Sequence, residues 1–335
     1  MGINKKLVSV IVVSRNAKNT VRRCLNSILS QTYPNIEVVV VDSSDDGAEK
    51  IIEEYQDKSK FPFRIIYQEP KGVGAARNAG LVNAKGDIIL GVDVDVFIPV
   101  DFIKKIAEPF NDSDKVMGVY TKRIVKSSSN TLFSRLVVLY ENIMMSRPPY
   151  KFGHIGLGAV RKEVWRMIGG IDTDLEVGED VVYNKKLEKI KKDLEAKGYL
   201  FPVVDTTTVE EKQGQTFSEY WKRCIWYGKS WANMKYLKSA LKMNLIAIIG
   251  AAYIIVFPFV ILGMLIYGYP VGQIVLASIP VIGLFAYMTS RAIAREVITW
   301  EIILLPFIVY YKSLWTFVGF VTGLLDNITL KRAPK

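Results

Sequence analysis

The chain has 335 residues, of which 50% are hydrophobic, and a formal net charge of +11. The length suits one sizeable catalytic domain and a smaller companion. Two cysteines, Cys24 and Cys224, are too few and too far apart for a disulfide framework or a zinc site. No nucleic-acid motif accompanies the positive charge, which favours an anionic membrane surface or a phosphorylated substrate.

β-Branched runs alternate with helical patterns in the first part of the chain. We expect strands over 8–13, 36–41, 64–67 and 87–92, with helices over 21–29, 48–55 and 75–84. Continuous β-branched runs are typical of strands that are buried on both faces. The alternation predicts an α/β fold with an open, mostly parallel sheet flanked by helices.

Polar residues follow three of the expected strands. In parallel sheets, ligands bind at the carboxyl ends of the strands, so clusters at these ends are the first sign of a site. The clusters are Ser14, Arg15 and Asn16, then Asp42 and Asp45, and finally Asp93 and Asp95.

Asp93 and Asp95 stand two positions apart, so they would share one face of a regular strand. Two carboxylates beside a diphosphate suit Mg²⁺ or Mn²⁺, which neutralises the charge on a departing nucleoside diphosphate. The alternative is a solvated turn at the strand end. Asp42 also has two interpretations, because its carboxylate can bind a nucleobase or ribose, or cap the loop 43–47.

The segment GVGAAR at 72–77 resembles a dinucleotide-binding fingerprint. However, Arg77 replaces the third glycine, and Pro70 separates the glycines from the preceding strand. A nicotinamide site is therefore disfavoured, and Arg77 is better suited to a phosphate or carboxylate partner.

Glu179 and Asp180 open an expected helix that ends near Lys197. Acidic residues are common at helix N-termini because the helix dipole stabilises them. The functional interpretation is a general base for an acceptor hydroxyl, which needs burial to offset the dipole. His154 is the only histidine, and it would contact the sugar or acceptor, or serve as an ordinary loop residue.

The C-terminal part of the chain is apolar and indicates membrane association. We expect basic, aromatic interfacial helices over 216–243 and a transmembrane region over 244–330. Spans are predicted over about 245–267 and 271–289, and the apolar segment 302–325 spans or re-enters. Lys222 and Arg223 would contact lipid phosphates or clamp a donor diphosphate. The flanking basic residues place the catalytic domain, 1–215, on the cytoplasmic face.

Three segments, in this order, resemble glycosyltransferase family 2, the inverting enzymes with the GT-A fold. They are SVIVVSRNAKNTVRRCLNSILSQTYPNIEVVVVDSSDDG, KGVGAARNAGLVNAKGDIILGVDVDV and GGIDTDLEVGEDVVYNKKL. Ser14 and Arg15 stand where the family usually has Pro and Tyr, which blurs which base is read. The QxxRW motif of processive polysaccharide synthases is absent, and WKRCIWYGKSW stands in that region instead.

The resemblance implies roles for individual residues. Asp42 would contact the base, Asp93 the ribose or metal, and Asp95 the metal. Asp180 would be the catalytic base, with Glu179 beside it. The remaining residues expected at the nucleotide are Ser14, Arg15, Asn16, Asp45, Lys71 and Arg77.

The resemblance also implies an activity: inverting, metal-dependent transfer of a hexose from a UDP- or GDP-sugar to a membrane lipid such as polyprenyl or dolichyl phosphate. One alternative is extension of a lipid-linked saccharide or other glycan at a hydroxyl. Others are a non-catalytic membrane scaffold or flippase subunit, and a nucleotidyltransferase, which would release pyrophosphate. We expect an integral membrane protein without a nucleic-acid partner, and the sequence leaves a homo-oligomer open.

Overall fold

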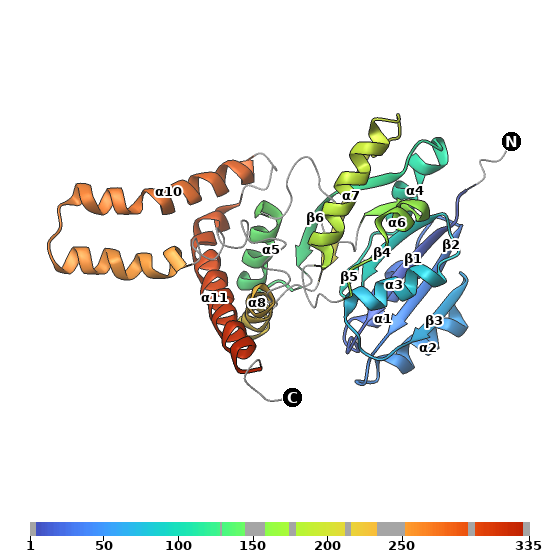
Figure 1. The fold of residues 1–335 in the computed structure, drawn as a ribbon, viewed down its shortest axis with the longest axis horizontal. Helices are drawn as coiled ribbons and strands as arrows, with labels where there is room; N and C mark the ends of the chain where they lie inside the picture. Colours follow the sequence, from blue (N-terminus) through green and yellow to red (C-terminus); the bar gives the residue numbers. More distant parts are fainter. Residues whose placement is uncertain are drawn as a thin grey trace. The chain divides into compact units, whose positions relative to one another are not determined.

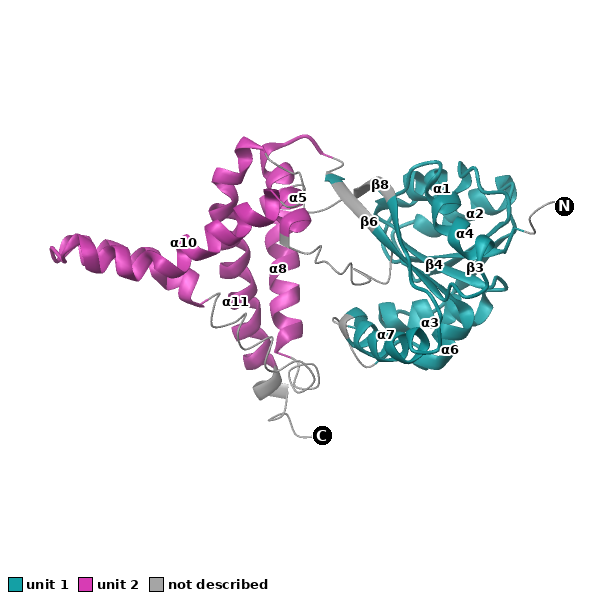
Figure 2. Cartoon of the chain, turned by 90° about the horizontal axis from the view of Figure 1, so that it is seen from above, with its two compact units in different colours: residues 1–128, 146–212 teal, residues 129–145, 213–335 magenta. Residues whose placement is uncertain are grey.

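The computed structural model describes residues 5–127, 129–144, 158–173, 179–211, 216–232, 252–293 and 299–330. The chain divides into two compact units (Figure 2). Unit 1 comprises Met1–Ser128 and Ser146–Lys212, and unit 2 comprises Ser129–Met145 and Gln213–Lys335. The C-terminal part of unit 2 begins close to the expected boundary at 215, while residues 129–145 join it from the middle of the chain.

Unit 1 is built on a sheet whose described strands follow the order β3-β2-β1-β4-β7-β6-β8-β5 (Figure 1). Four neighbouring strands are parallel: β3 (Phe63–Tyr67), β2 (Ile36–Asp42), β1 (Val8–Ser14) and β4 (Ile88–Asp93). The others are β7 (Ala159–Arg161), antiparallel to β4 and β6 (Gly118–Ser127), β8 (Val203–Glu211), parallel to β6, and β5 (Val96–Phe97), antiparallel to β8. The predicted α/β fold is confirmed, and its four expected strands lie side by side as one parallel half of the sheet.

Helices cover both faces of this sheet (Figure 2). One layer contains α1 (Val21–Leu29), α2 (Ala48–Lys58) and α4 (Phe102–Asp112), and the other contains α3 (Val73–Asn83), α6 (Lys162–Ile168) and α7 (Glu179–Glu195). Every residue of β2 is buried, as its continuous apolar run predicts. On the second face, Trp165 of α6 packs against Tyr183 of α7, with ring centroids 4.6 Å apart, and fixes α7 on the sheet.

All the described regular elements of unit 2 are helices. It contains α5 (Leu132–Met144), α8 (Phe217–Trp231), an apolar helix at Ala252–Ile266, α10 (Val271–Ile293), the 3₁₀ helix η1 (Trp300–Leu304) and α11 (Leu305–Leu330). Two stretches, Val271–Ile293 and Trp300–Asp326, are long and apolar enough to cross a membrane. They include the expected segments 271–289 and 302–325. Of the expected span 245–267, residues 245–251 lie outside the described part of the chain.

Candidate functional site

The carboxyl ends of β1, β2 and β4 meet at one edge of the sheet, as the sequence predicts. Ser14 pairs in register with Asp42, and Val13 pairs with Asp93. Asp42 and Asp93 are thus two strands apart, about 10 Å along the sheet edge. Because strand side chains alternate and the two positions differ by one register step, Asp42 and Asp93 leave the sheet on opposite faces.

The loops that follow β1 and β2 are bound to each other. The Asn16 N–H donates to Ser44 Oγ (2.9 Å), and the Asp45 N–H donates to Asn16 Oδ1 (3.0 Å). Asn16 adopts φ 51°, a left-handed conformation that asparagine tolerates better than most residues. These bonds hold the first two polar clusters in a fixed geometry before any ligand arrives.

Asp42 caps the second of these loops. Its carboxylate accepts from Ser44 Oγ (2.7 Å) and the Ser44 N–H (3.2 Å), which is the capping arrangement considered from the sequence. A carboxylate offers about four acceptor positions, so these bonds leave capacity for further donors. The side chain is buried, and a ligand would reach it from the loop side.

Arg77 of α3 connects two carboxylates from distant parts of the sequence. Its Nη2 donates to Asp93 Oδ1 (2.9 Å) and its Nη1 donates to Glu179 Oε1 (2.8 Å). The Arg77 side chain is only 13% exposed, so water screens these charged bonds weakly. The sequence favoured a phosphate or carboxylate partner for Arg77, and the structure shows two carboxylate partners. The contact expected between Arg77 and the nucleotide stays a prediction.

Glu179 and Asp180 begin α7 beside this arginine. Burial raises the pKa of Glu179, Arg77 opposes that shift, and Asp180 adds to it. Burial lowers the pKa of the Arg77 guanidinium, but Asp93, Glu179 and the half-buried Asp180 outweigh it, so that the pKa is raised. Three carboxylates therefore act on one guanidinium.

Asp95 lies in the turn between β4 and β5, so the regular strand ends at Asp93. The strand alternation that would place both side chains on one face does not extend to Asp95. The two carboxylates still share one locality, because both act on the buried Cys24 and reinforce the burial that raises the pKa of its thiol. Two neighbouring carboxylates with hard oxygen donors fit Mg²⁺ or Mn²⁺, although no group of three or more acidic, His or Cys ligands occurs among the described residues.

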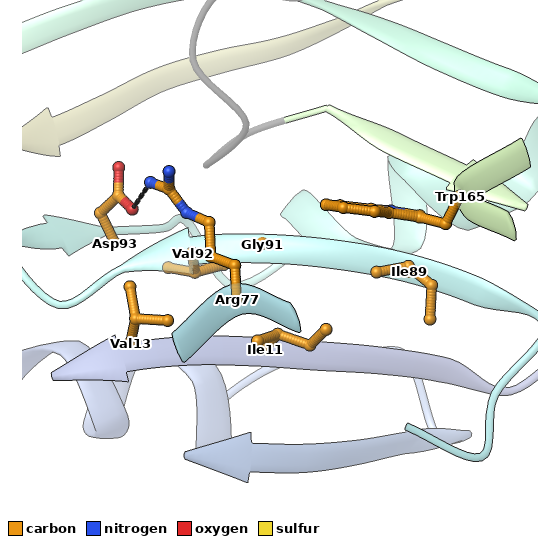
Figure 3. Close-up of a pocket in the computed structure, with 8 residues that line it drawn as sticks. All are labelled: Ile11, Val13, Arg77, Ile89, Gly91, Val92, Asp93 and Trp165. Atoms are coloured by element: carbon orange, nitrogen blue, oxygen red, sulfur yellow. Dashed lines mark hydrogen bonds and ion pairs between the residues drawn. The ribbon is translucent and has the colours of Figure 1, made fainter. Parts of the chain in front are cut away.

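A small pocket opens beside Arg77 and Asp93 (Figure 3). Its floor is formed by Ile11, Ile89 and neighbouring sheet residues, with Trp165 at its apolar end. The volume is about 10 Å³, room for roughly one water molecule. This pocket is too small for a sugar.

Helix α3 also holds the segment that precedes α7. Asn78 Nδ2 donates to the Ile171 carbonyl (2.9 Å), and the Ile171 N–H donates to Asn78 Oδ1 (2.9 Å). At Gly74, an added Cβ would lie 2.7 Å from the Asp172 carbonyl oxygen, so only glycine fits. The sequence interpretation missed Asn78. The available signal was an asparagine inside a helix, where its propensity is poor and a tertiary role is favoured.

The other expected residues are placed as follows. Arg15 and Lys71 are exposed in unit 1, and His154 lies outside the described residues. Lys222 is exposed on α8 in unit 2, and Arg223 contacts Tyr227 on the same helix, with its Cζ 5.8 Å from the ring centroid. The functional roles expected for all these residues stay predictions.

Known proteins resemble this chain in sequence and in fold. Residues 9–168 match the family described as Glycosyl transferase family 2. Glycosyltransferase GlyA of Streptococcus pneumoniae serotype 4 is 34% identical over 200 residues, which cover 54% of this chain and 28% of GlyA. Glycosyltransferase GlyG of the same organism is 34% identical over 119 residues, covering 34% of this chain and 39% of GlyG. The chain thus spans less than half the length of these relatives.

A solved structure shares the fold. The mannosyltransferase PcManGT from Pyrobaculum calidifontis, in complex with GDP-Man and Mn²⁺, superposes with a TM-score of 0.58 and 19% identity, over 95% of this chain and 87% of that one. The family match and the relatives support a transferase of the glycosyltransferase class, and the solved structure supports the fold.

Proposed function

We propose that this chain, which matches Glycosyl transferase family 2 over residues 9–168, transfers a sugar from a UDP- or GDP-sugar to a lipid acceptor at a membrane, such as polyprenyl or dolichyl phosphate. The bridge that Arg77 forms between Asp93 and Glu179 carries the proposal. It joins the segment expected at the donor to the segment expected at the acceptor. The names of the glycosyltransferase relatives, and the GDP-Man and Mn²⁺ bound by PcManGT, support the class of donor.

On the donor side, Asp93 and Asp95 would hold a divalent cation. When bound, that ion supplies Lewis-acid neutralisation of the leaving nucleoside diphosphate. Asp42 and the two bound loops receive the nucleoside, with Ser14, Asn16 and Asp45 around it. Arg77 fixes the Asp93 carboxylate so that little reorganisation is needed when the donor arrives.

On the acceptor side, Asp180 faces the oxygen that attacks the anomeric carbon. The new bond forms to this oxygen as the bond to the diphosphate breaks, with inversion at the carbon. A lipid phosphate is already largely ionised near neutral pH, so Asp180 would only orient it. The alternative acceptor, a hydroxyl of a lipid-linked saccharide, would have to give its proton to Asp180.

Unit 2 supports a lipid-borne acceptor. Its helix α10 presents exposed apolar side chains almost throughout, including Leu276, Ile279 and Ile282. Only 6% of the apolar window in α10 is buried within the protein, and exposed apolar surface of this extent marks contact with lipid or another apolar partner. We place the catalytic unit on the cytoplasmic face on the strength of the basic residues that flank the apolar segments.

Transfer to lipid tests this function. The purified protein is incubated with radiolabelled UDP- and GDP-sugars, polyprenyl phosphate and Mn²⁺ or Mg²⁺. We expect labelled lipid and one nucleoside diphosphate per sugar transferred, both lost with EDTA or Asp95→Ala. Release of pyrophosphate would identify a nucleotidyltransferase, and donor binding without turnover on any lipid would favour a scaffold.

A further inference from the structure

The long apolar helices of unit 2 fall into two groups, which differ in how much of their apolar surface is buried against other helices. The helix Ala252–Ile266 and α10 form a hairpin, tied by the Tyr253 hydroxyl, which donates to the Ala277 carbonyl (2.7 Å). Its connection, Gly268–Pro270, carries no charge. Only 6% of the apolar window in α10 is buried within the protein, against 33% for Trp300–Asp326. The hairpin therefore presents bare apolar surface, whereas α11 is partly covered.

The cover of α11 comes from α8, which runs beside it in the same direction. Contacts advance together along both helices. The ring centroids of Phe217 and Tyr311 are 5.5 Å apart, those of Trp221 and Trp315 are 5.1 Å apart, and Lys229 Nζ lies 2.9 Å from Asp326 Oδ2. This order along the two chains shows that α8 accompanies most of the length of α11.

Glycines bring the two backbones into direct contact. A Cβ added at Gly319 would lie 2.2 Å from the Ile225 carbonyl oxygen, and one at Gly228 would lie 2.0 Å from the Thr316 carbonyl oxygen. Gly323 is similarly close to Lys229. Gly319 and Gly323 stand four positions apart. Small residues at this spacing allow the tight helix packing that is common in membrane proteins. The α8–α11 pair is therefore one rigid layer, and both helices must adopt the same depth in a bilayer.

Charged side chains limit how deeply the α8–α11 pair can enter a bilayer. Helix α8 carries Glu219, Lys222 and Lys229, all exposed. Lys222 follows Trp221, which packs on Trp315 near the middle of α11. If α11 crossed the bilayer, Lys222 would therefore reach the hydrocarbon centre, where a charged lysine is strongly disfavoured.

An ion pair between α11 and α5 also limits how deeply α11 can enter a bilayer. Lys312 of α11 lies 3.4 Å from Glu141 of α5, and their side chains are 26% and 16% exposed. A crossing α11 would carry this ion pair, and with it α5, into hydrocarbon. In the headgroup layer, lysines instead reach water and lipid phosphates while Trp rings such as Trp226 sit at headgroup depth.

We propose that the α8–α11 pair lies along the headgroup layer and that only the 252–293 hairpin enters the bilayer core. Figure 1 agrees with this arrangement, since the hairpin projects away from α11 instead of running alongside it. The chain then crosses the membrane twice, so Lys331, Arg332 and Lys335 return to the side from which it entered. A third span would instead place these basic residues on the opposite side of the membrane, against the positive-inside rule. The inference rests on the membrane location in the proposed function.

Labelling of single introduced cysteines tests this topology in the full-length chain. Sealed inverted membrane vesicles from expressing cells are treated with a membrane-impermeant maleimide, before and after permeabilisation with detergent. Three variants report three places: Lys58→Cys in the catalytic unit, Tyr269→Cys at the hairpin tip and Lys331→Cys after α11. The unsubstituted chain is the background control, because Cys24 and Cys224 are buried.

We expect Lys58→Cys and Lys331→Cys to react in intact vesicles, and Tyr269→Cys to react only after permeabilisation. Protection of Lys331→Cys together with Tyr269→Cys would show that α11 crosses and would overturn the proposal. Reaction of Tyr269→Cys in intact vesicles would overturn it as well, because the hairpin would not cross. Neither result depends on turnover, so adding Asp95→Ala to each variant leaves the labels unchanged, and loss of sugar transfer is a separate outcome.

Discussion

Arg77 Nη2 lies 2.9 Å from Asp93 Oδ1 and makes the charge of Asp93 depend on a second carboxylate, because Nη1 of the same guanidinium lies 2.8 Å from Glu179 Oε1. Any cation that binds Asp93 competes with Arg77. Glu179 weakens that competition by neutralising part of the guanidinium charge. Glu179, which lies 86 positions after Asp93 in the sequence, therefore influences the proposed metal site.

The first prediction concerns the affinity for Mn²⁺. In Glu179→Gln the Arg77 charge acts more strongly on Asp93, so we expect Mn²⁺ to bind about tenfold more weakly. In the double variant Arg77→Gln/Glu179→Gln both charges are gone, and binding should return at least to the wild-type level. Isothermal titration measures both affinities. A double variant that binds more weakly than the single one would indicate structural damage and contradict the account.

The second prediction concerns Asp180 and separates the two acceptor classes. Asp180→Asn removes the base without changing the side-chain shape. With a hydroxyl acceptor, we expect kcat to fall by ~10²-fold or more, since general-base catalysis typically contributes that much. With a lipid phosphate, we expect a smaller loss and an unchanged pH profile. Equal losses on the two acceptors would contradict the role assigned to Asp180.

The third prediction concerns the packing of α8 on α11. Gly319→Ala places a Cβ 2.2 Å from the Ile225 carbonyl oxygen, and such overpacking destabilises by about 1–3 kcal/mol. Gly283→Ala is the matched control, because nothing lies within 4 Å of its added Cβ and alanine favours the helix. Thermal unfolding in detergent should show a lower Tm for Gly319→Ala alone. Equal Tm values would show that the two backbones are not in contact.

The fourth prediction concerns the two thiols. Burial raises the pKa of Cys24, with Asp95 and Asp93 adding to the shift, and burial raises the pKa of Cys224 to about 11. The thiolate is the reactive form, so at pH 8 both side chains remain thiols and react slowly. We expect a disulfide reagent such as Ellman's to modify neither cysteine in the folded protein and both after denaturation. Cys224→Ala isolates Cys24, and rapid reaction of that variant would contradict its burial.

The parallel half of the sheet was predictable because its signal is local. The runs 8–13 and 36–41 are β-branched throughout, and no competing pattern occurs there. The positions of Asp42 and Asp93 at strand ends followed from the same signal. The strands β6, β7 and β8 were missed because β7 has only three residues and β6 and β8 pair across more than seventy residues of sequence.

The Arg77 bridge was beyond prediction for a different reason. The sequence shows that Arg77 suits a carboxylate, but Asp93 and Glu179 become its partners only when α3, β4 and α7 have packed. The membership of α5 in unit 2 is similar, since Glu141 pairs with Lys312 at a separation of 171 residues. The composition of α5 does not indicate that Glu141 pairs with Lys312 or that α5 belongs to unit 2.

Donor binding to the wild-type protein tests the central claim most directly. UDP- and GDP-sugars are titrated with Mn²⁺ present or absent, and the same titration is repeated with Asp95→Asn and with the exposed control Asp57→Asn. The account predicts that one nucleotide class binds only with Mn²⁺, that Asp95→Asn abolishes this binding and that Asp57→Asn preserves it. Binding of the donor that is equally tight without Mn²⁺ and with Asp95→Asn would contradict it.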